Sequence, residues 1–536
     1  MGSGHILVYA FDVLIQLYSA EGYRARDAAE LILQHNLFGL DIDKRAFQLS
    51  YFALMMKGRQ HSRRLLSKGI KPNIYTVPDN FGIGETELQL VNMTFHDDSK
   101  GKEDLLKLID GFKNGNELGS LIKFDGIDFD NLKEILKTDT ISMLEQGIRE
   151  MIYVGEILQQ TYDISITNPP YMGSSGMNKI LSNFVKKHYS DSKSDLFGVF
   201  IERLYQFTKS TGYYAMITQH AWMFLSSFEK LRKKINQQTL INMAHLGTRA
   251  FEEIGGEVVQ TTSFIISPNK YLNHQGSYLR LVEFNDHNLK EEKFIEGSLN
   301  KSKNIYFLTN QDNFIKIPGN PISYWVSENF IKAFSNMAFS KNTFSDGQIL
   351  TGNNNLFLKY LWEINQNKIG VAKGWMLHAK GGEYRKWFGN IEWVINWSDS
   401  SISHYKNDSI ARFPKDDILF REGVTWSLVT TNPVFSVRKL DTSSTFNKAA
   451  ATLLFKNDDL IEYYLGILNS KPINEFMNII NPTLNNNIKD VLSVPLPEIV
   501  CLNTEVSSLV TQNISISESD WNSFENSWEF SRHPLT

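Results

Sequence analysis

Apolar residues in the first 335 positions alternate between helical spacing and short strand-like runs. Helical spacing predicts helices over residues 6–20 (mostly buried), 24–35 (amphipathic), 44–56, 195–209 and 226–236, and polar helices between 100 and 160. Apolar runs predict strands at 37–40, 85–95, 162–167 (buried), 213–218, 240–246 and 258–266. We expect Asp195 to cap its helix and Gly212 to lie in the turn after it. Strands alternating with helices predict an α/β fold with a largely parallel, doubly wound sheet.

The pattern changes beyond residue 335. Helical periodicity fades, and clusters of Asn, Gly and Trp separate short strand-like segments. This change predicts a domain boundary near 335–345. Helix returns at 459–480 and ends at Asn481-Pro482-Thr483, and the polar segment past 500 has no obvious final element.

Composition is that of an ordinary globular protein of two or three domains, with 536 residues, 42% hydrophobic and 21% charged. No apolar run is long enough to span a membrane, and no signal peptide is recognisable, so we expect no membrane partner. The single cysteine, Cys501, excludes an internal disulfide and a multi-cysteine zinc site. Together these features favour a reducing cytoplasm.

A net charge of −4 argues against a chain that is uniformly coated by nucleic acid. Residues 351–450 nevertheless hold 13 Lys and Arg against 9 Asp and Glu, together with six of the ten tryptophans. Such a window fits a nucleic-acid surface, and it fits a Trp-rich β core with a solvated rim equally well.

The most informative stretch is Asn168-Pro169-Pro170-Tyr171, which follows the strand 162–167. Each proline lacks an N–H and fixes φ, so strand pairing stops here in a rigid corner. In open α/β sheets, ligands bind at the carboxyl ends of strands. An amide, backbone carbonyls without strand partners and an aromatic ring are suited to a planar base that carries an amine. A lone Asn-Pro is more often a plain turn, but the full tetrapeptide after an apolar strand is rarer.

A second group of residues is suited to a cofactor. Gly2-Ser3-Gly4 precedes the first helix, and Asp41-Ile42 follows the strand 37–40. Glycines let the backbone approach a ligand, the helix N-terminus offers free N–H donors to an anion, and a carboxylate after the second strand can bind ribose hydroxyls. Met-Gly-Ser is also a common remnant of an expression tag, and Asp41 or Asp43 could instead cap the next helix.

Taken in order, these stretches resemble the BREX phage-defence adenine-specific DNA methyltransferases (PglX-like), and more broadly the fused methyltransferase–specificity proteins of restriction-modification systems. The matching stretches are Gly2–Leu7, Gly39–Asp43, Asn116–Ile122, Thr167–Gly173, Phe251–Gln260, Thr351–Asn354, Gly381–Trp387 and Asn481–Thr483. The tetrapeptide also occurs in protein-glutamine methyltransferases, so it does not choose the substrate by itself.

The resemblance implies a Rossmann-like sheet that uses S-adenosyl-L-methionine (SAM), followed by a mixed α+β target-recognition domain. It implies a catalytic domain over 1–340, target recognition over 341–500 and the start of a further region over 501–536. In these families an acidic residue and a Pro precede the glycine loop, so we expect that the first strand is missing here and that the chain is a fragment. Two alternatives remain: a DNA-binding specificity fragment without catalytic activity, and a methyltransferase that acts on protein or RNA.

The resemblance also implies roles for residues. Asn168 and Pro169 would accept hydrogen bonds from the N6 amine of a flipped adenine, with Pro170 shaping the corner and Tyr171 stacking on the base. Gly2, Ser3, Gly4, Asp41 and Ile42 would bind SAM. Double-stranded DNA would be the partner, with other proteins of the defence system as further partners. Candidates for DNA contacts are Lys373, Lys380, Arg385, Lys386 and Arg412. No spacing suggests a metal site, and His5, His220 and His245 need no chemical role.

Overall fold

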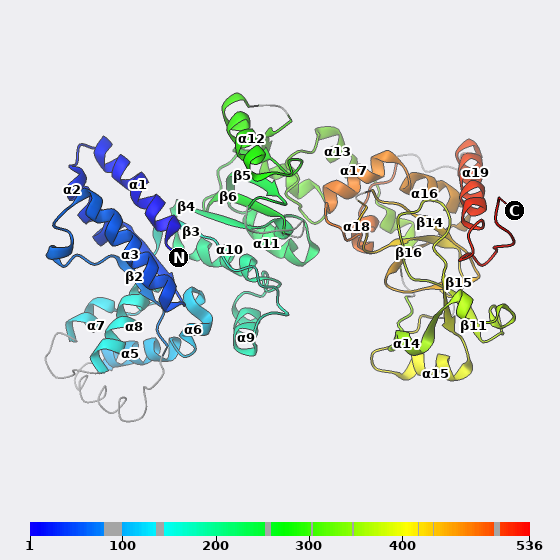
Figure 1. Ribbon diagram of the computed structural model, residues 1–536, viewed down its shortest axis with the longest axis horizontal. Helices are drawn as coiled ribbons and strands as arrows, with labels where there is room; N and C mark the ends of the chain where they lie inside the picture. The colour runs from blue at the N-terminus through cyan, green and yellow to red at the C-terminus, as the bar shows by residue number, and fades with distance from the viewer. Residues whose placement is uncertain are drawn as a thin grey trace. The chain divides into compact units, whose positions relative to one another are not determined.

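The computed structural model describes residues 1–79, 99–135, 144–251, 259–301, 304–345, 348–415, 418–432, 434–497 and 504–535. These residues form two compact units (Figure 1). We call Met1–Trp222 with Lys230–Asn310 the N-terminal unit, and Met223–Glu229 with Gln311–Thr536 the C-terminal unit. The division at residue 311 falls before the expected boundary at 335–345. Within the described ranges, no helix is long and apolar enough to span a membrane.

The N-terminal unit alternates helices and strands, as the hydrophobic pattern predicts. Its helical elements are α1 (His5–Ala20), α2 (Ala25–Leu31), the π-helix η1 (Ile32–Asn36), α3 (Lys44–His61), η2 (Leu66–Lys68), α5 (Ser99–Gly111), α6 (Gly115–Leu118), η3 (Gly119–Leu121), α7 (Phe129–Ile135), α8 (Leu144–Gln159), α9 (Lys179–His188), α10 (Leu196–Phe207), α11 (Glu229–Ile235) and α12 (His287–Asn300). Its strands are β1 (Phe38–Asp41), β2 (Asn73–Thr76), β3 (Tyr162–Thr167), β4 (Thr208–Gln219), β5 (Thr239–Gly247), β6 (Thr261–Ser267), β7 (Gln275–Arg280) and β8 (Tyr306–Asn310). The expected strand at 85–95 lies outside the described residues.

These strands form two sheets. β1 and β2 pair in parallel, and the others form a six-stranded sheet in the order β3-β4-β6-β5-β7-β8. β3 and β4 are parallel, but β6 is antiparallel to both β4 and β5, and β8 is antiparallel to β7. The α/β fold is confirmed. β5 and β7 are parallel, so β3, β4, β5 and β7 run in one direction, as a largely parallel sheet requires, and β6 and β8 are the two reversed strands. A hydrophobic pattern records which residues are buried and carries no information about strand direction.

The strand β3 is exposed, which also differs from expectation. Ile164 and Ile166 are 65% and 47% exposed, and within β3 only Ser165 is buried. The reason is that β3 ends the six-stranded sheet and, among the strands that the structure describes, pairs with β4 alone. The β3 and β1 strands begin close together, since the Phe38 and Tyr162 rings lie 5.3 Å apart. Gly212 lies inside β4, where an added Cβ would come within 2.4 Å of the Asp163 carbonyl oxygen.

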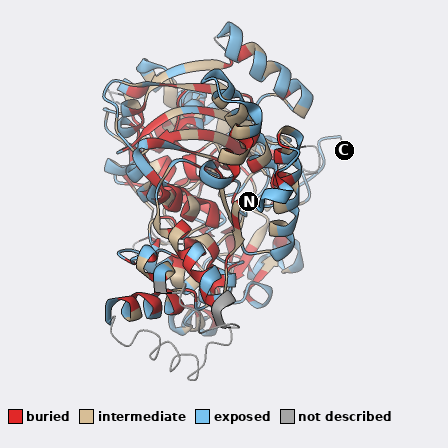
Figure 2. Cartoon of the chain, turned by 90° about the vertical axis from the view of Figure 1, so that its left-hand side faces the viewer, coloured by how far each residue is buried: buried red, intermediate tan, exposed pale blue. Residues whose placement is uncertain are grey.

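One core packs α1, α2 and α3 against β1 and β2 around Phe11, Ala28, Ile32 and Leu54. The helix α1 buries only Leu7 and Phe11, so the expectation of a mostly buried helix is wrong. Figure 2 shows buried residues on the strands and inner helix faces, and exposed residues on the outer helix faces. In α1 the apolar stripe that faces the core is therefore narrower than the sequence suggests.

The C-terminal unit is a mixed α+β structure. Its strands are β9 (Thr343–Phe344), β10 (Leu358–Tyr360), β11 (Trp375–Ala379), β12 (Trp393–Asn396), β13 (Gly423–Ser427), β14 (Arg438–Leu440), β15 (Ser444–Phe446) and β16 (Ala450–Phe455). Its helices are α13 (Glu328–Ala333), α14 (Asn354–Phe357), α15 (Asp399–Asn407), α16 (Ile461–Leu468), α17 (Lys471–Ile480), α18 (Ile488–Leu492) and α19 (Thr504–Trp521), with short 3₁₀ turns η5 (Ser226–Phe228), η6 (Gln311–Lys316), η7 (Phe339–Lys341), η8 (Leu361–Glu363), η9 (Gln366–Lys368) and η10 (Asp458–Leu460); η4 (His220–Met223) joins the units.

Two four-stranded sheets organise this unit, in the orders β10-β12-β11-β15 and β14-β13-β16-β9. A core around Trp426, Leu453 and Tyr464 joins the second sheet to α16 and α17. The helix ending before Asn481 is confirmed, whereas the segment past 500, expected to lack a final element, contains α19. α19 buries only Val510 and Trp521, and so few apolar contacts leave little trace in a polar sequence.

Candidate functional site

The tetrapeptide Asn168–Tyr171 lies immediately after β3, where the sequence places it. Thr167, the last strand residue, pairs with Met216 of β4, and the chain then leaves the sheet. Pro169 is buried, whereas Asn168 and Pro170 are exposed. Neither the Asn168 side chain nor the Pro169 carbonyl has a hydrogen-bond partner within the described ranges. The corner therefore has an exposed amide at Asn168 and an unbonded carbonyl at the buried Pro169, and two such acceptors are what an exocyclic amine requires.

Tyr171 is held in a fixed orientation beside this corner. Its ring is half-buried and meets Phe197 edge-on, with the ring centroids 6.4 Å apart and the planes at 88°. Burial raises the pKa of the Tyr171 phenol, so the ring remains neutral. A neutral aromatic ring held by a second ring can stack on a planar ligand with little loss of side-chain entropy.

Asp195 ties the loop that follows Tyr171 to α10. Its Oδ1 accepts hydrogen bonds from the Met172 N–H at 3.1 Å and from the Phe197 N–H at 3.3 Å. The Leu196 N–H donates to the Met172 carbonyl at 3.0 Å. The predicted helix cap at Asp195 is confirmed, and the same carboxylate also fixes the residue next to Tyr171. Burial raises the pKa of Asp195 despite these hydrogen bonds.

Asp41 ends β1, and its carboxylate accepts from three main-chain nitrogens. Oδ2 accepts from Met1 at 3.1 Å and Gly2 at 2.7 Å, and Oδ1 accepts from Asp43 at 3.0 Å. Burial acts to raise the pKa of Asp41, but the hydrogen bonds and the positive charge on Met1 outweigh it, so the pKa is lowered. Asp43, not Asp41, caps α3, by accepting from the Arg45 N–H at 2.8 Å. The Asp41 carboxylate instead binds the turn that precedes α1.

That turn brings the glycines to Asp41. Gly4 is the N-cap of α1 with φ of 88°, and a Cβ there would lie 3.0 Å from the Ser50 Cα. The Ser50 hydroxyl donates to the Gly2 carbonyl at 2.9 Å, and the Ser3 hydroxyl lies 2.5 Å from His5 Nδ1. No side chain caps α1, so its first N–H groups are available to an anionic group. Ile42 is 53% exposed beside this turn.

The segment that contains α6 and η3 lies next to the site, and the sequence alone did not show this position. A Cβ on Gly119 would lie 2.8 Å from the Ile42 side chain, so this segment borders the Asp41 end of β1. Glu117 accepts a hydrogen bond from the side chain of Asn178, which caps α9 after the Asn168 corner. The segment thus contacts both halves of the site. Its resemblance to a family motif was the signal that pointed to it, although no chemistry was assigned.

Among the candidates for DNA contacts in the C-terminal unit, Lys373 and Arg412 are exposed. Within the described part of the chain, neither side chain forms an ion pair. Lys380 is less free, because its ammonium lies 3.5 Å from the centre of the Trp393 ring. Burial lowers the pKa of Lys380.

The two remaining candidates have partners within the unit. Arg385 forms an ion pair with Asp520 at 2.9 Å and lies over the Trp521 ring. Lys386 donates to the Asn469 carbonyl at 3.0 Å. A nucleic acid would have to displace these contacts to use either residue, so Lys373 and Arg412 are the better placed of the five.

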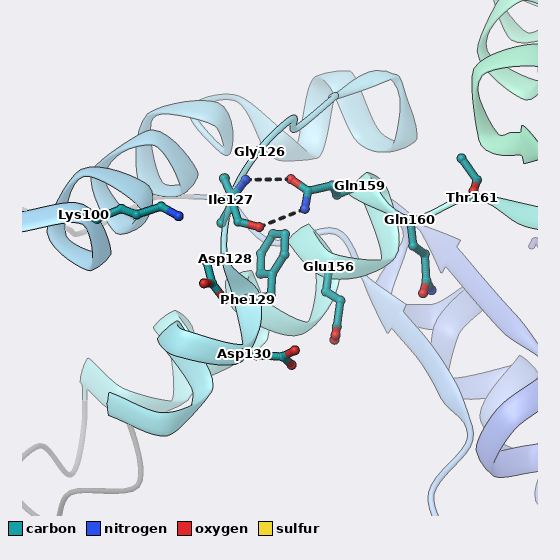
Figure 3. A pocket seen from close by; sticks show the side chains of 10 residues that line it. All are labelled: Lys100, Gly126, Ile127, Asp128, Phe129, Asp130, Glu156, Gln159, Gln160 and Thr161. Atoms are coloured by element: carbon teal, nitrogen blue, oxygen red, sulfur yellow. Dashed lines mark hydrogen bonds between the residues drawn. The ribbon is translucent and has the colours of Figure 1, made fainter. Parts of the chain in front are cut away.

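A polar cavity of about 750 Å³ opens beside α5, α7 and α8 of the N-terminal unit. Figure 3 shows Asp128, Asp130 and Glu156 lining it, and Gln159 bonded twice to the Ile127 main chain. No residue expected to bind SAM or DNA lines this cavity. Among the residues that the structure places, no three His, Cys, Asp or Glu side chains form a group that could hold a metal ion.

His220 and His245 form a buried pair, with Nδ1 of the first 2.8 Å from Nε2 of the second. Burial lowers the pKa of His220 to about 4, and burial also lowers the pKa of His245 well below its ordinary value. Both rings are therefore neutral at physiological pH and share a hydrogen bond, which fits the expectation that they have a structural role.

The sequence is similar to those of two proteins named as adenine-specific methyltransferases. It is 42% identical over 566 aligned residues to "Adenine-specific methyltransferase PglX" of Lacticaseibacillus casei (strain Zhang), and 38% identical over 571 to "Adenine-specific methyltransferase BrxX" of Escherichia coli O9:H4 (strain HS). This chain is similar to both proteins along its whole length. Both alignments include all of this chain and 46% of the relative, so the chain spans about half the length of these PglX-type relatives. Residues 35–251 also match the Eco57I restriction-modification methylase family.

Solved structures of similar fold are restriction-modification enzymes. The type IIL enzyme MmeI in complex with DNA matches 99% of this chain and 65% of its own, at 12% identity and a TM-score of 0.52. A nuclease-deletion mutant of the type ISP enzyme LlaGI with a DNA substrate mimic matches 96% of this chain and 44% of its own, at 11% identity and a TM-score of 0.54. Because the sequence identity is this low, the matches establish similarity of fold alone.

Proposed function

We propose that this chain carries the catalytic and target-recognition parts of a SAM-dependent methyltransferase that modifies the N6 amine of adenine in double-stranded DNA, within a phage-defence or restriction-modification system. The observation that carries this proposal is the corner after β3, where the exposed Asn168 side chain and the Pro169 carbonyl have no hydrogen-bond partner among the described residues. Relationship to PglX and BrxX supports adenine as the base.

The corner would activate a poor nucleophile. The adenine amine lone pair is delocalised into the ring, and hydrogen bonds from both amine hydrogens to Asn168 Oδ1 and the Pro169 carbonyl favour a more tetrahedral nitrogen. The same acceptors stabilise positive charge that develops on nitrogen during attack. Tyr171 would stack on the base, worth about 1–3 kcal/mol. This offsets part of the few kcal/mol needed to extrude the base from a duplex.

The residues around Asp41 fit SAM in their chemistry, and SAM would supply an electrophilic methyl group. Asp41 has the acceptor oxygens for ribose hydroxyls, Ile42 has an exposed apolar side chain, and the uncapped start of α1, next to Gly2, Ser3 and Gly4, has donors for a carboxylate. These residues would bind and orient the cofactor, while the corner orients the amine.

A non-catalytic DNA-binding specificity role is the second candidate, and one observation favours it. Asp41 Oδ2 already accepts from Met1 and Gly2, so ribose hydroxyls would compete for it. Titration calorimetry with SAM separates the two candidates, since absence of binding would exclude catalysis by this chain. In the C-terminal unit Lys373 and Arg412 would contact DNA under either candidate. Association with other proteins of a defence system stays a prediction.

The catalytic proposal is tested with Asn168→Ala. We expect N6-methyladenine formation on duplex DNA to fall about 100- to 1,000-fold, as for loss of one donor or acceptor at a reacting centre, with SAM binding retained. Ser175→Ala, in the exposed loop beyond the corner, is the matched control and should retain activity. Unchanged methylation by the Asn168 variant would show that the amide does not act on the amine.

A further inference from the structure

Arg438 is a buried cation without a partner. It lies on β14 and is 2% exposed. No hydrogen bond or ion pair involves its guanidinium within the described ranges, and its Nε is fully buried. Burial, and to a lesser degree the neighbouring charge of Arg385, lower the pKa of Arg438 to about 10, so it keeps its charge at neutral pH. Buried charges are ordinarily paired, because removing a charge from water without compensation is costly.

Arg203 of the N-terminal unit shows what a satisfied buried arginine looks like in this protein. It is 1% exposed, and burial lowers its pKa to about 10 as well. Its guanidinium, however, donates to the main-chain carbonyls of Ser120, Ile122 and Leu158, and stacks on Phe207 at 3.7 Å. The two side chains are equally buried, but only Arg203 is hydrogen-bonded. Burial alone therefore does not explain why the Arg438 guanidinium lacks hydrogen-bond partners.

The loop 381–390 between β11 and β12 pairs with β14 at Arg438. The Trp387 N–H donates to the Val437 carbonyl at 3.0 Å, and the Lys439 N–H donates back to the Trp387 carbonyl at 2.8 Å, on either side of Arg438. Thr425 pairs with Arg438 across β13 and β14, and Ser427, on the same face as Thr425, donates to a loop carbonyl. The loop therefore contacts the strand face that Arg438 shares with Thr425 and Ser427.

The loop holds a second arginine and is strained. Arg385 is paired with Asp520, which is itself 60% exposed. Trp387 has φ of 72°, a left-handed conformation that bulky side chains seldom adopt. Such strain persists where surrounding structure enforces it and is common in segments that move on ligand binding.

We propose that Arg438 and Arg385 form a binding site for a phosphate of the DNA backbone, which the phosphate enters when the loop 381–390 is displaced. The chemistry fits, because a guanidinium recognises phosphate through two parallel hydrogen bonds. A phosphate would supply the negative charge that Arg438 lacks, and Arg385 would exchange Asp520 for the same anion. This inference rests on the proposed DNA-binding function and identifies one place where DNA would be held.

The test uses the full chain and an Arg438→Met variant, with Arg203→Met as the matched control. Removing an unpaired buried charge does not destabilise a protein, whereas removing one that is hydrogen-bonded does. We expect Arg438→Met to keep or raise Tm and Arg203→Met to lower it by about 5 °C or more. Fluorescence anisotropy with duplex DNA should show binding by Arg438→Met weakened about tenfold or more, with the slope of log K against log salt reduced by about 0.9, the value of one phosphate contact.

Two results would overturn the inference. One is a Tm for Arg438→Met that falls as far as that of Arg203→Met, which would make the residue structural. The other is an unchanged DNA affinity and salt slope. If wild-type protein does not bind DNA at any salt concentration, the proposed function fails, and pyrophosphate then tests the anion site separately. A pyrophosphate-dependent rise in Tm that Arg438→Met loses supports the site, and an equal rise in both proteins refutes it.

Discussion

Asp195 offers a direct test of how the corner is positioned, because one carboxylate oxygen supports two elements. In Asp195→Ala, the Phe197 N–H at the start of α10 loses its cap and the Met172 N–H loses its acceptor. Loss of an N-cap costs about 1 kcal/mol. A half-buried N–H left without an acceptor costs about 1 kcal/mol more. The expected loss is therefore about 2 kcal/mol, or about 30-fold in a local opening equilibrium.

The measurement is hydrogen–deuterium exchange followed by mass spectrometry. Peptides that contain Met172 and Phe197 should exchange about 30-fold faster in Asp195→Ala, while the start of α3, capped by Asp43, should be unchanged. Asp195→Asn is the matched control, because its amide oxygen can accept the same two hydrogen bonds. Burial raises the pKa of Asp195, so the charged form is penalised above that pKa, and the neutral amide escapes the penalty. Equal acceleration in the Asn and Ala variants, or none in either, would refute this account.

Two further predictions follow from a glycine and from a histidine. Gly4→Ala and Gly22→Ala place a Cβ at nearly the same φ, 88° and 85°, but only the Cβ at position 4 approaches Ser50, at 3.0 Å. The left-handed φ should cost each variant about 1 kcal/mol in the free energy of unfolding by denaturant, and Gly4→Ala should lose more than this and bind SAM more weakly. Equal losses in the two variants would contradict a close approach at Gly4. The pKa of His220 is lowered to about 4, so between pH 6.5 and pH 4 a proton binds this residue in the unfolded state and not in the folded state. The free energy of unfolding should therefore decrease as the pH is lowered, by about 2 kcal/mol from pH 7 to pH 5 for this residue. A His220→Gln variant with the same pH dependence as the wild type would contradict this.

The sequence predicted those parts of the site that depend on neighbouring residues. The cap at Asp195 and the corner after β3 follow from local rules about side chains and prolines, and both are confirmed in position. The roles of Asn168 and Asp41 stay predictions. The choice between Asp41 and Asp43 as helix cap was open from sequence, because both lie within reach of α3, and only the hydrogen bond from Arg45 decides it.

Features that depend on distant residues were not predictable in the same way. The antiparallel position of β6 results from pairing between segments far apart in the chain, which hydrophobic spacing does not encode. The contact of Glu117 with Asn178 and the isolation of Arg438 are likewise visible only in three dimensions. A charge without a partner has no signature in sequence, since the same arginine with a nearby carboxylate would look identical.

The exposed edge of β3 has a consequence for work with this chain in solution. Ile164 and Ile166 project from a strand whose second edge is unpaired within the described ranges, and such an edge is a template for strands of other molecules. Asp163, ion-paired with Lys209 at 2.9 Å, is the one charge on β3 that opposes such pairing. We therefore expect this strand to promote self-association at high concentration, and we expect Ile166→Lys to reduce it.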